Sequence, residues 1–344
     1  MSFTALVEQV GPGTPAGTIL RRYWQPVAVA AQLPVGGTQP LRILGEAFTL
    51  YRDERGAAHV VGARCAHRGT FLHTGWVEDD CIRCFYHGWK FEPSGQCVEQ
   101  PAEPAGFARA VRIPSHPVEE YAGLVFAFFG EGAPPPLPRF PELEAPGIKV
   151  VAGIRPPGPW PVNYFQVLEN SVDPVHLCFV HRATQPFTRV IPEVRAERSG
   201  DGVAMTAVRD GVERHTKYWF PHLIQLPLWP IPGERIECPF FNWKVPVDDG
   251  HTLFIAATAV PEHLADRVDD EEIGGRTMEA AAGPGLLAGD RRPASVTEED
   301  YVAIVGQGTF ADRVGERLGR SDVGVIELRR LWQEHLDALA GVAP

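Results

Sequence analysis

The chain has 344 residues, of which 44% are hydrophobic, and this length predicts two domains with sizeable cores. Its formal net charge is −11, with 32 Lys and Arg scattered among 43 Asp and Glu, which argues against a nucleic-acid-binding surface. No stretch approaches the roughly 20 apolar residues of a membrane span, and residues 8–15 contain a charge and turn formers where a signal peptide needs an apolar run. We therefore expect a soluble, cytoplasmic protein that binds neither nucleic acid nor membrane.

The first third of the chain has the pattern of a β domain. Residues 41–51, 59–64 and 122–129 alternate or run apolar in the manner of strands. Residues 130–141 hold five prolines, which neither a helix nor a central strand accepts, and this stretch is the predicted linker. We predict one domain over residues 1–140, including an N-terminal helical segment, and a second over 141–344.

The second domain is predicted to be α+β, an antiparallel sheet backed by helices. Residues 162–181 are helical in pattern apart from Pro174, residues 203–260 give several strands, and residues 297–340 are helical again. Residues 274–293 are rich in Gly, Ala and charge, and they predict a surface loop.

Two Cys and His pairs form the first candidate metal site. Cys65 and His67 are followed, after sixteen intervening residues, by Cys84 and His87, so two loops can each offer one thiolate and one imidazole. Six cysteines in so long a chain are too few for a disulfide scaffold. Structural zinc accepts the same ligands and is the alternative. A site using Cys81 and Cys84 would leave both histidines unexplained.

The residues around these pairs resemble the signature of Rieske ferredoxins. The matching segments are residues 65–69 (CAHRG) and 84–91 (CFYHGWKF). The resemblance implies a [2Fe–2S] cluster in which the two cysteines bind one iron and the two histidines the other, which raises the reduction potential.

A second constellation lies in residues 169–176, followed by His181. Asn170, Asp173 and His176 are three apart and would share a helical face, on which Asp173 can hold His176 by a hydrogen bond. His176 and His181 are five apart, so a regular helix must loosen between them before both can bind one ion. Two unrelated histidines near a helix end are the alternative.

This stretch resembles the mononuclear iron motif of the Rieske non-haem iron oxygenases, Asn-x-x-Asp-x-x-His-x4-His. Iron of this type needs a carboxylate beside two histidines, and the resemblance points to Asp300 within residues 297–307. Thr297 and Asp300 can also be read as a helix cap and its capping-box partner. Three neighbouring acids are weaker candidates for the third ligand: Glu298, Glu299 and Asp290.

The resemblance covers nearly the whole chain and indicates an oxygenase component of the phthalate dioxygenase-like or dicamba monooxygenase-like branch. It implies a helix-grip-like catalytic domain whose Fe(II) activates O2 to hydroxylate or demethylate an aromatic or heteroaromatic substrate, for which we expect an acid. Asn170 departs from the small residue typical of phthalate-type members, and it is similar to the demethylating monooxygenases. Mono- and dioxygenation both stay open.

The resemblance also implies partners. No dinucleotide-binding fingerprint is present, so a separate NAD(P)H-dependent reductase or ferredoxin must supply electrons. In the family, electrons cross between subunits, so Asp173 would link His87 of one chain to His176 of the next in a closed ring, expected to be a homotrimer. Basic residues near the cluster are candidate contacts for an acidic partner: Arg68, Arg83 and Lys90.

Substrate-pocket residues are expected on the helix before the iron motif and on the later strands. Arg209 and Arg214 are candidates to pair with a substrate carboxylate. The remaining candidates are Asn163, Phe165, Val167, His215, Trp219, Phe220, His222, Phe241 and Trp243. Two other functions stay open, a Rieske-type electron-transfer protein without oxygenase activity and a zinc-stabilised binding protein.

Overall fold

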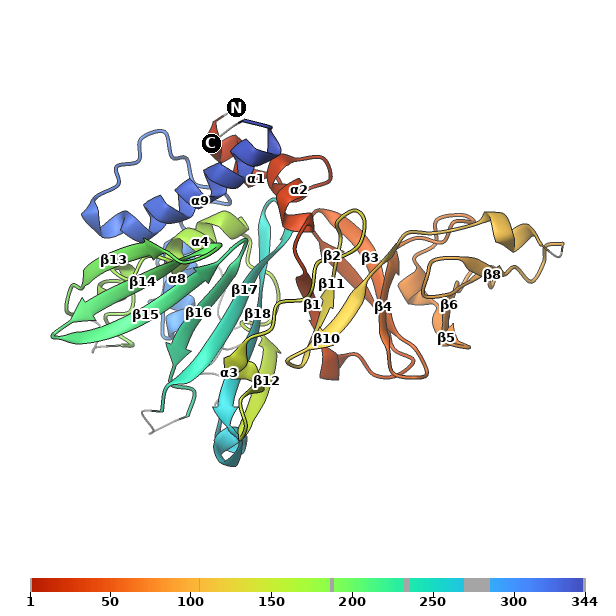
Figure 1. The fold of residues 1–344 in the computed structure, drawn as a ribbon, viewed down its shortest axis with the longest axis horizontal. Helices are drawn as coiled ribbons and strands as arrows, with labels where there is room; N and C mark the ends of the chain where they lie inside the picture. Colours follow the sequence, from red (N-terminus) through yellow and green to blue (C-terminus); the bar gives the residue numbers. More distant parts are fainter. Residues whose placement is uncertain (1, 105, 186–188, 232–235, 269–284, 343–344) are drawn as a thin grey trace. The chain divides into compact units, whose positions relative to one another are not determined.

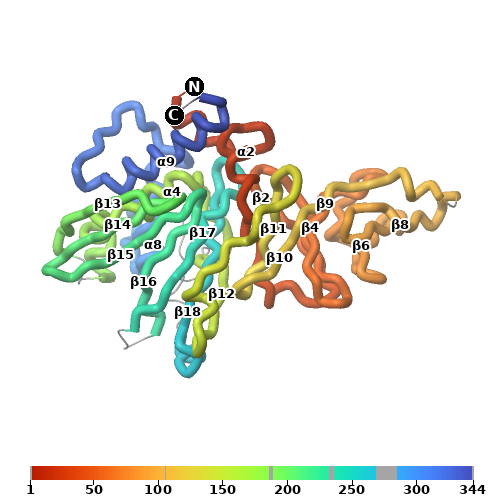
Figure 2. Tube along the Cα trace, in the orientation of Figure 1, coloured from red at the N-terminus to blue at the C-terminus, as the bar shows by residue number. Residues whose placement is uncertain are grey.

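A computed structural model describes residues 2–104, 106–185, 189–231, 236–268 and 285–342. The chain folds into two compact units, one of residues 21–138 and one of residues 1–20 together with 139–344. The chain therefore passes once from the larger unit into the smaller one and back (Figures 1 and 2). The predicted division at residue 140 lies close to the second crossing, but residues 1–20 belong to the larger unit instead of the first domain.

Specific contacts hold the N-terminal segment on the larger unit. The Asn163 Nδ2 group donates hydrogen bonds to the carbonyl oxygens of Glu8 (2.8 Å) and Asp249 (2.6 Å). The Phe3 ring lies edge-on to Phe165, with centroids 5.5 Å apart. Tertiary contacts of this kind are not visible in a sequence pattern. Two helices make up the segment: α1 (Phe3–Glu8) and α2 (Pro15–Arg21).

The smaller unit is mostly β, as the strand-like pattern predicted, and its described strands form three antiparallel sheets. The first has the order β1 (Gln25–Val29), β11 (Leu124–Ala127), β10 (Val118–Tyr121). The second has the order β2 (Thr38–Ile43), β3 (Glu46–Arg52), β4 (Ala58–Gly62), β9 (Ser115–His116). The third has the order β5 (Trp76–Glu78), β6 (Cys81–Arg83), β7 (Lys90–Phe91), β8 (Cys97–Glu99). One buried cluster joins Tyr51, Ile82 and Phe91 to Cys65 and Cys84.

The larger unit is built on a seven-stranded antiparallel sheet, which confirms the predicted α+β class. Its order is β12 (Ile148–Ile154), β18 (His251–Pro261), β17 (Cys238–Asp248), β16 (Leu223–Leu228), β15 (Val212–Trp219), β14 (Gly202–Arg209), β13 (Glu193–Arg198). Besides α1 and α2, its described α-helices are α3 (Pro141–Glu144), α4 (Tyr164–Ser171), α7 (Gly285–Ala288), α8 (Val296–Val305) and α9 (Val323–Leu339).

The two faces of this sheet have different neighbours. Phe254 packs with Val167 of α4 and Tyr301 of α8, and α9 runs along β13 and β14 (Figure 1). Because side chains alternate along a strand and paired residues share a face, Lys244 lies on the same face as its cross-strand partner Phe254. We call this the helix-covered face. Its central residues on β17 and β18 are Phe240, Asn242, Lys244, Phe254, Ala256 and Thr258.

The helices are shorter than the sequence pattern predicted. The helix expected over residues 162–181 ends at Ser171, shortly before Pro174, which cannot donate a backbone hydrogen bond and disfavours a helical residue before it. The helix expected over residues 297–340 is two helices, and the first ends just before Gly308, whose φ of 94° is left-handed. Of the predicted loop 274–293, residues 274–284 lie outside the described residues.

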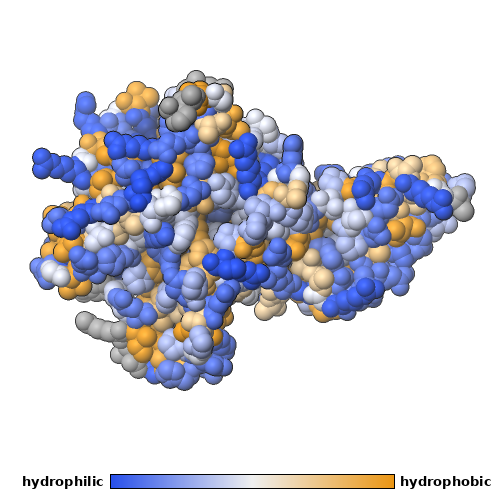
Figure 3. Space-filling view, viewed as in Figure 1, coloured by the Kyte–Doolittle hydropathy of each residue, from blue (hydrophilic) through white to orange (hydrophobic). Residues whose placement is uncertain are grey.

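The surface is consistent with the scattered charge of the sequence. Figure 3 shows hydrophilic residues spread over the face of the molecule that it draws, with hydrophobic patches between them. None of the helices that the structure describes is both long and apolar enough to cross a bilayer.

Gly324 of α9 provides a test of how closely this helix must approach the iron motif. A Cβ atom at this position would lie 2.2 Å from the carbonyl oxygen of Val172, the residue after α4. We expect Gly324→Ala to lower the free energy of unfolding by about 1–3 kcal/mol, because the backbone carbonyl cannot move aside without a shift of the segment. Denaturant titration measures the change. Gly315→Ala, which adds a Cβ in open space, is the control, and equal losses in both variants would contradict the close approach.

Candidate metal centres

Two similar loops present the first set of ligands. The Cys65 carbonyl accepts a hydrogen bond from the Gly69 N–H (3.0 Å), and the Cys84 carbonyl accepts one from the Gly88 N–H (3.1 Å). Both glycines have a left-handed φ, 76° and 72°, which most other residues adopt only with strain. Each turn therefore carries one cysteine and one histidine two or three residues later, and the glycine closes the turn.

The four side chains fit a Rieske cluster. Cys65 and Cys84 are buried, while His87 is exposed. Burial, with a further contribution from the Cys84 thiol, raises the pKa of Cys65 to about 12, and a bound metal would favour its thiolate. The imidazole of His67 stacks on Trp89, and its Nδ1 is buried with no hydrogen-bond partner in the described part of the chain. A nitrogen left in this state is suited to bind a metal.

The basic residues beside these loops do not form the predicted docking patch. Arg83 and Lys90 are buried, and both pair with Glu99, at 2.7 and 3.0 Å. Their charges are therefore neutralised within the unit. Arg68 alone of the three predicted contacts is exposed, and its guanidinium lies 5.6 Å from the centroid of the Tyr86 ring.

The second set of ligands begins where α4 ends. Asp173 Oδ1 accepts a hydrogen bond from the Val175 N–H (2.8 Å), and the Asp173 carbonyl oxygen is in close contact with His176 Nδ1. The Asp173 carboxylate is farther from the same nitrogen, at 3.9 Å. Asp173 thus holds His176 through its backbone, which differs from the side-chain contact predicted for one helical face. The Asn170 carbonyl accepts the Asp173 N–H at 3.2 Å.

His181 is buried and held by an acid that the sequence offered only as a weaker ligand candidate. Its Nδ1 lies 3.0 Å from Glu299 Oε2, which also accepts a hydrogen bond from the Thr184 hydroxyl (2.6 Å). A carboxylate behind a metal-binding imidazole fixes the tautomer and raises the basicity of the ligand. Glu299 therefore orients His181, and only the position beside Asp300 could have hinted at this.

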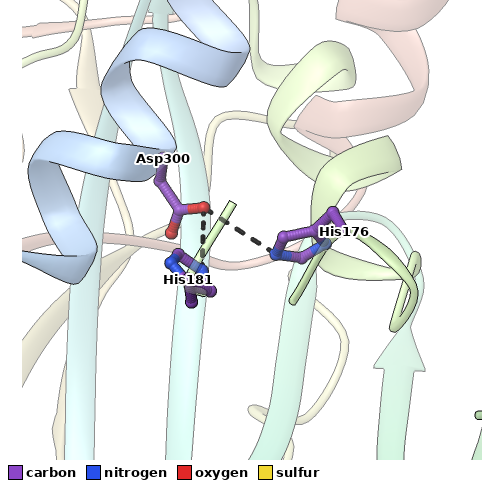
Figure 4. Close-up of side chains that lie close together, drawn as sticks. All are labelled: His176, His181 and Asp300. Carbon is purple, nitrogen blue, oxygen red and sulfur yellow. Dashed lines mark ion pairs between the residues drawn. The ribbon is translucent and has the colours of Figure 1, made fainter. Parts of the chain in front are cut away.

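The three predicted ligands of the mononuclear site converge (Figure 4). Asp300 Oδ1 lies 3.8 Å from His176 Nε2 and 3.3 Å from His181 Nε2, and one ligand atom from each residue lies within 4.8 Å of the others. Ser295 caps α8, so the capping role considered for Asp300 is not present. Asp300 Oδ1 is buried and accepts no hydrogen bond from the described residues, which fits an atom that faces a metal.

The pKa directions of the two histidines differ. Burial lowers the pKa of His176 although Asp300 and Asp173 oppose it, so the neutral imidazole that binds metals is favoured. Burial also lowers the pKa of His181, but Asp300 and Glu299 outweigh it and raise the value overall. The histidines, with Lys244, hold the pKa of Asp300 below its usual range against the effect of burial.

Three of the predicted pocket residues lie away from the helix-covered face. Trp219, Phe241 and Trp243 lie on the face opposite the helices, where they pack around Phe140. Arg209 donates to the Pro174 carbonyl (2.7 Å) and Arg214 to that of Pro227 (3.1 Å). Lys244 lies on the helix-covered face, and the sequence analysis did not name it as a pocket residue.

Comparison with known proteins supports this description. Residues 23–121 match the Rieske [2Fe-2S] domain. The chain is 31% identical to the 5,5'-dehydrodivanillate O-demethylase oxygenase subunit of Sphingobium sp. SYK-6, covering 96% of this chain and 79% of that one. It is 34% identical to the phenoxybenzoate dioxygenase alpha subunit of Ectopseudomonas oleovorans, covering 95% and 83%. Its fold is similar to that of dicamba monooxygenase, with a TM-score of 0.72 at 20% identity and coverage of 94% and 99%.

Fold and site together define a metalloprotein with a β unit for an iron–sulfur cluster and a separate unit for one further metal ion. The chain belongs to the Rieske non-haem iron oxygenases, as an oxygenase component. The cofactors of such a component are the Rieske [2Fe–2S] cluster and mononuclear non-haem iron.

Glu299 yields a prediction for the second centre. Glu299→Gln keeps the shape of the side chain but removes the charge behind His181, so we expect affinity for the mononuclear metal to fall by about 10- to 100-fold. Metal analysis after dialysis against graded chelator measures the loss, while the Rieske absorption stays unchanged. Glu298→Gln is the matched control on the same helix, because Glu298 pairs with Arg291 and accepts a hydrogen bond from the Ala294 N–H. Equal metal retention in the two variants would show that Glu299 does not support the site.

Proposed function

We propose that this oxygenase hydroxylates or demethylates an aromatic or heteroaromatic acid with O2. The observation that carries the proposal is the convergence of two imidazole Nε2 atoms on the buried Oδ1 of Asp300. Two imidazoles and one carboxylate leave positions open on a non-haem iron. The ligands proposed for this iron are His176, His181 and Asp300, and those proposed for the cluster are Cys65, His67, Cys84 and His87.

The chain's own residues prepare both centres. The cluster, when bound, stores an electron for the mononuclear iron, which needs electrons to activate O2. Asp173 and Glu299 hold the Nδ1 atoms of the two histidines, so both Nε2 atoms turn toward Asp300. Apolar side chains that include Val167, Phe254 and Tyr301 form a buried cluster that joins α4 and α8 to the sheet.

Two kinds of observation support an aromatic acid as substrate. Relatives of the chain are named for dehydrodivanillate and phenoxybenzoate. The helix-covered face combines the aromatic rings of Phe240 and Phe254 with a lysine. An aromatic ring packs well against such rings, and an ammonium group attracts a carboxylate.

The proposed assembly is a closed homotrimer, served in the cytoplasm by a separate NAD(P)H-dependent reductase or ferredoxin. Asp173, and with it Asn170, would act at the boundary between subunits, linking His87 of one chain to His176 of the next. Two features support this. His87 is exposed on its unit, and the Asp173 side chain keeps 26% of its surface exposed. A ring places each such pair at an equivalent interface.

The test of the proposed function is product analysis with the full chain. Iron-loaded protein, a surrogate ferredoxin and reductase, NADH and O2 are supplied with benzoate, 3-phenoxybenzoate and vanillate, each beside its neutral amide. We expect an oxygen-dependent product from at least one acid, and formaldehyde where a methoxy group is removed.

The variants His176→Ala and His181→Ala are the controls for this reaction. Both should keep the Rieske absorption and lose turnover, because the two centres use separate ligands. A brown protein that exchanges electrons but oxidises none of the probes would favour the electron-transfer alternative. A colourless protein with zinc and no acid-labile sulfide would favour the zinc-stabilised one.

Asp173→Asn separates the bridging role from the structural one. The amide oxygen can still accept the Val175 N–H, so folding, assembly and both metals should survive. Loss of the charge should slow reoxidation of a reduced cluster by about tenfold or more in a single turnover, because charge-assisted hydrogen bonds are stronger than neutral ones. Asp312→Asn is the matched control, since Asp312 accepts the Val314 N–H in the same local turn at 3.0 Å. Normal reoxidation in Asp173→Asn, or activity in a monomer, would rule out the bridge.

A further inference from the structure

Lys244 differs from the other lysines of this chain. The sequence contains four. Lys90 pairs with Asp79 and Lys149 with Asp266, at 2.8 and 3.4 Å. The other two lie over aromatic rings: Lys217 over Trp219 at 3.4 Å, and Lys244 over Phe254 at 4.4 Å.

Lys244 is also the more deeply placed of these two lysines. The residue is 7% exposed on the helix-covered face, and its ammonium group forms no ion pair or hydrogen bond with the described residues. A buried ammonium without an anion is costly, and a ring face compensates for only part of the lost hydration. Burial lowers the pKa of Lys244 to about 7, although the Asp300 carboxylate opposes this effect. Asp300 acts on this ammonium group without forming an ion pair with it in the described part of the protein, so the charged form of Lys244 can still gain from a directly bound anion.

The position of Lys244 relates it to the mononuclear centre. Phe254, which lies under its ammonium group, shares a buried cluster with Tyr301, the residue after Asp300, and both rings lie against Trp160. Asn242 stands two residues earlier on the same strand and face. Its Oδ1 is buried and has no hydrogen-bond partner among the described residues. Two polar groups without partners thus lie together on the side of the sheet that α8 covers.

Arg209 and Arg214 are less suited to the same task. The guanidinium of Arg209 donates to the carbonyls of Pro174 and Val190, and that of Arg214 donates to Pro227 and lies over Trp229. Both arginines are therefore occupied by the protein. Lys244 has no such partner among the described residues.

We propose that Lys244, assisted by Asn242, binds the carboxylate of the substrate and so sets the orientation of the aromatic ring. The ammonium group pairs with one carboxylate oxygen, and the Nδ2 group of Asn242, the donor of that amide, can donate a hydrogen bond to the same end of the molecule. A carboxylate held at Lys244 anchors one end of the molecule, so its uncharged ring is the part left to face the metal ligands. This inference rests on the proposed function and specifies the substrate class for that site.

Equilibrium binding under anaerobic conditions tests the proposal without turnover. Calorimetry of iron-loaded, oxidised protein compares benzoate, 3-phenoxybenzoate and vanillate with their neutral amides. In the wild type we expect at least one acid to bind at least tenfold more tightly than its amide. Lys244→Met should weaken binding of that acid at least tenfold and change amide binding less than twofold. Lys244→Arg, which keeps the charge, should retain the preference for the acid.

Lys217→Met is the matched control, because Lys217 also lies over an aromatic ring but on the opposite face of the sheet. It should leave both affinities unchanged. The proposal is overturned if Lys244→Met behaves as Lys217→Met does, if acid and amide lose affinity together, or if none of the three acids binds the wild type. Should Lys244→Met not fold, an equal affinity of Lys244→Arg for acid and amide overturns the proposal in its place.

The outcomes also separate this proposal from the proposed function. Oxidation of neutral aromatic probes alone, at equal rates in wild type and Lys244→Met, would overturn the role of Lys244 and leave the oxygenase intact. Acid binding that depends on Lys244 in a protein that oxidises none of the probes supports the carboxylate site while the proposed reaction fails.

Discussion

A buried carboxylate oxygen that faces two imidazole nitrogens is the constraint on which the larger unit depends. Asp300 is carried by α8, whereas His176 and His181 follow α4, so two distant parts of the chain must meet on one face of a sheet. A buried carboxylate is tolerated only when opposite charge or donors surround it. The histidines meet that need in the protein itself, and a divalent metal would meet it more completely.

Contacts outside the ligand set hold the helices around the mononuclear centre in place. Glu169 of α4 binds Arg313, and it also accepts a hydrogen bond from Arg329 Nε at 2.7 Å. Arg329 belongs to α9, the helix whose Gly324 lies against the carbonyl of Val172. The C-terminal helix α9 therefore contacts the chain both before and after the end of α4. A displacement of α9 would shift the backbone that leads to His176, although no residue of α9 belongs to the ligand set.

The sequence suggested ligands for the two centres on different physical grounds. The proposed cluster ligands lie on two turns closed by left-handed glycines, and a turn of this kind is encoded by neighbouring residues. Asp300 required the resemblance to a family, because no local rule connects it with His176. The ends of α4 and α8 were missed because the apolar periodicity of the sequence continues past Pro174 and Gly308, whereas the helical backbone stops before each of them.

The faces of the central strand were harder to predict. On β17, Asn242 and Lys244 alternate with Phe241, Trp243 and Val245, a pattern that ordinarily places the polar residues in solvent. In the structure both sets are buried, because α3 and Phe140 cover one face and the long helices cover the other. Alternation of polar and apolar side chains shows that a strand has two different faces. Which helix or loop covers each face depends on chain segments that are far away in the sequence.

The path of the chain through its two units has a consequence for engineering. Because residues 1–20 and 139–344 form one compact unit, the cluster-bearing residues 21–138 are an insertion with two peptide connections, at 20/21 and 138/139. A chimera that exchanges electron-transfer modules between relatives must therefore join both connections at once. A cut after residue 138 alone would transplant the first two helices as well, and the recipient would lose the carbonyl of Glu8 that Asn163 binds.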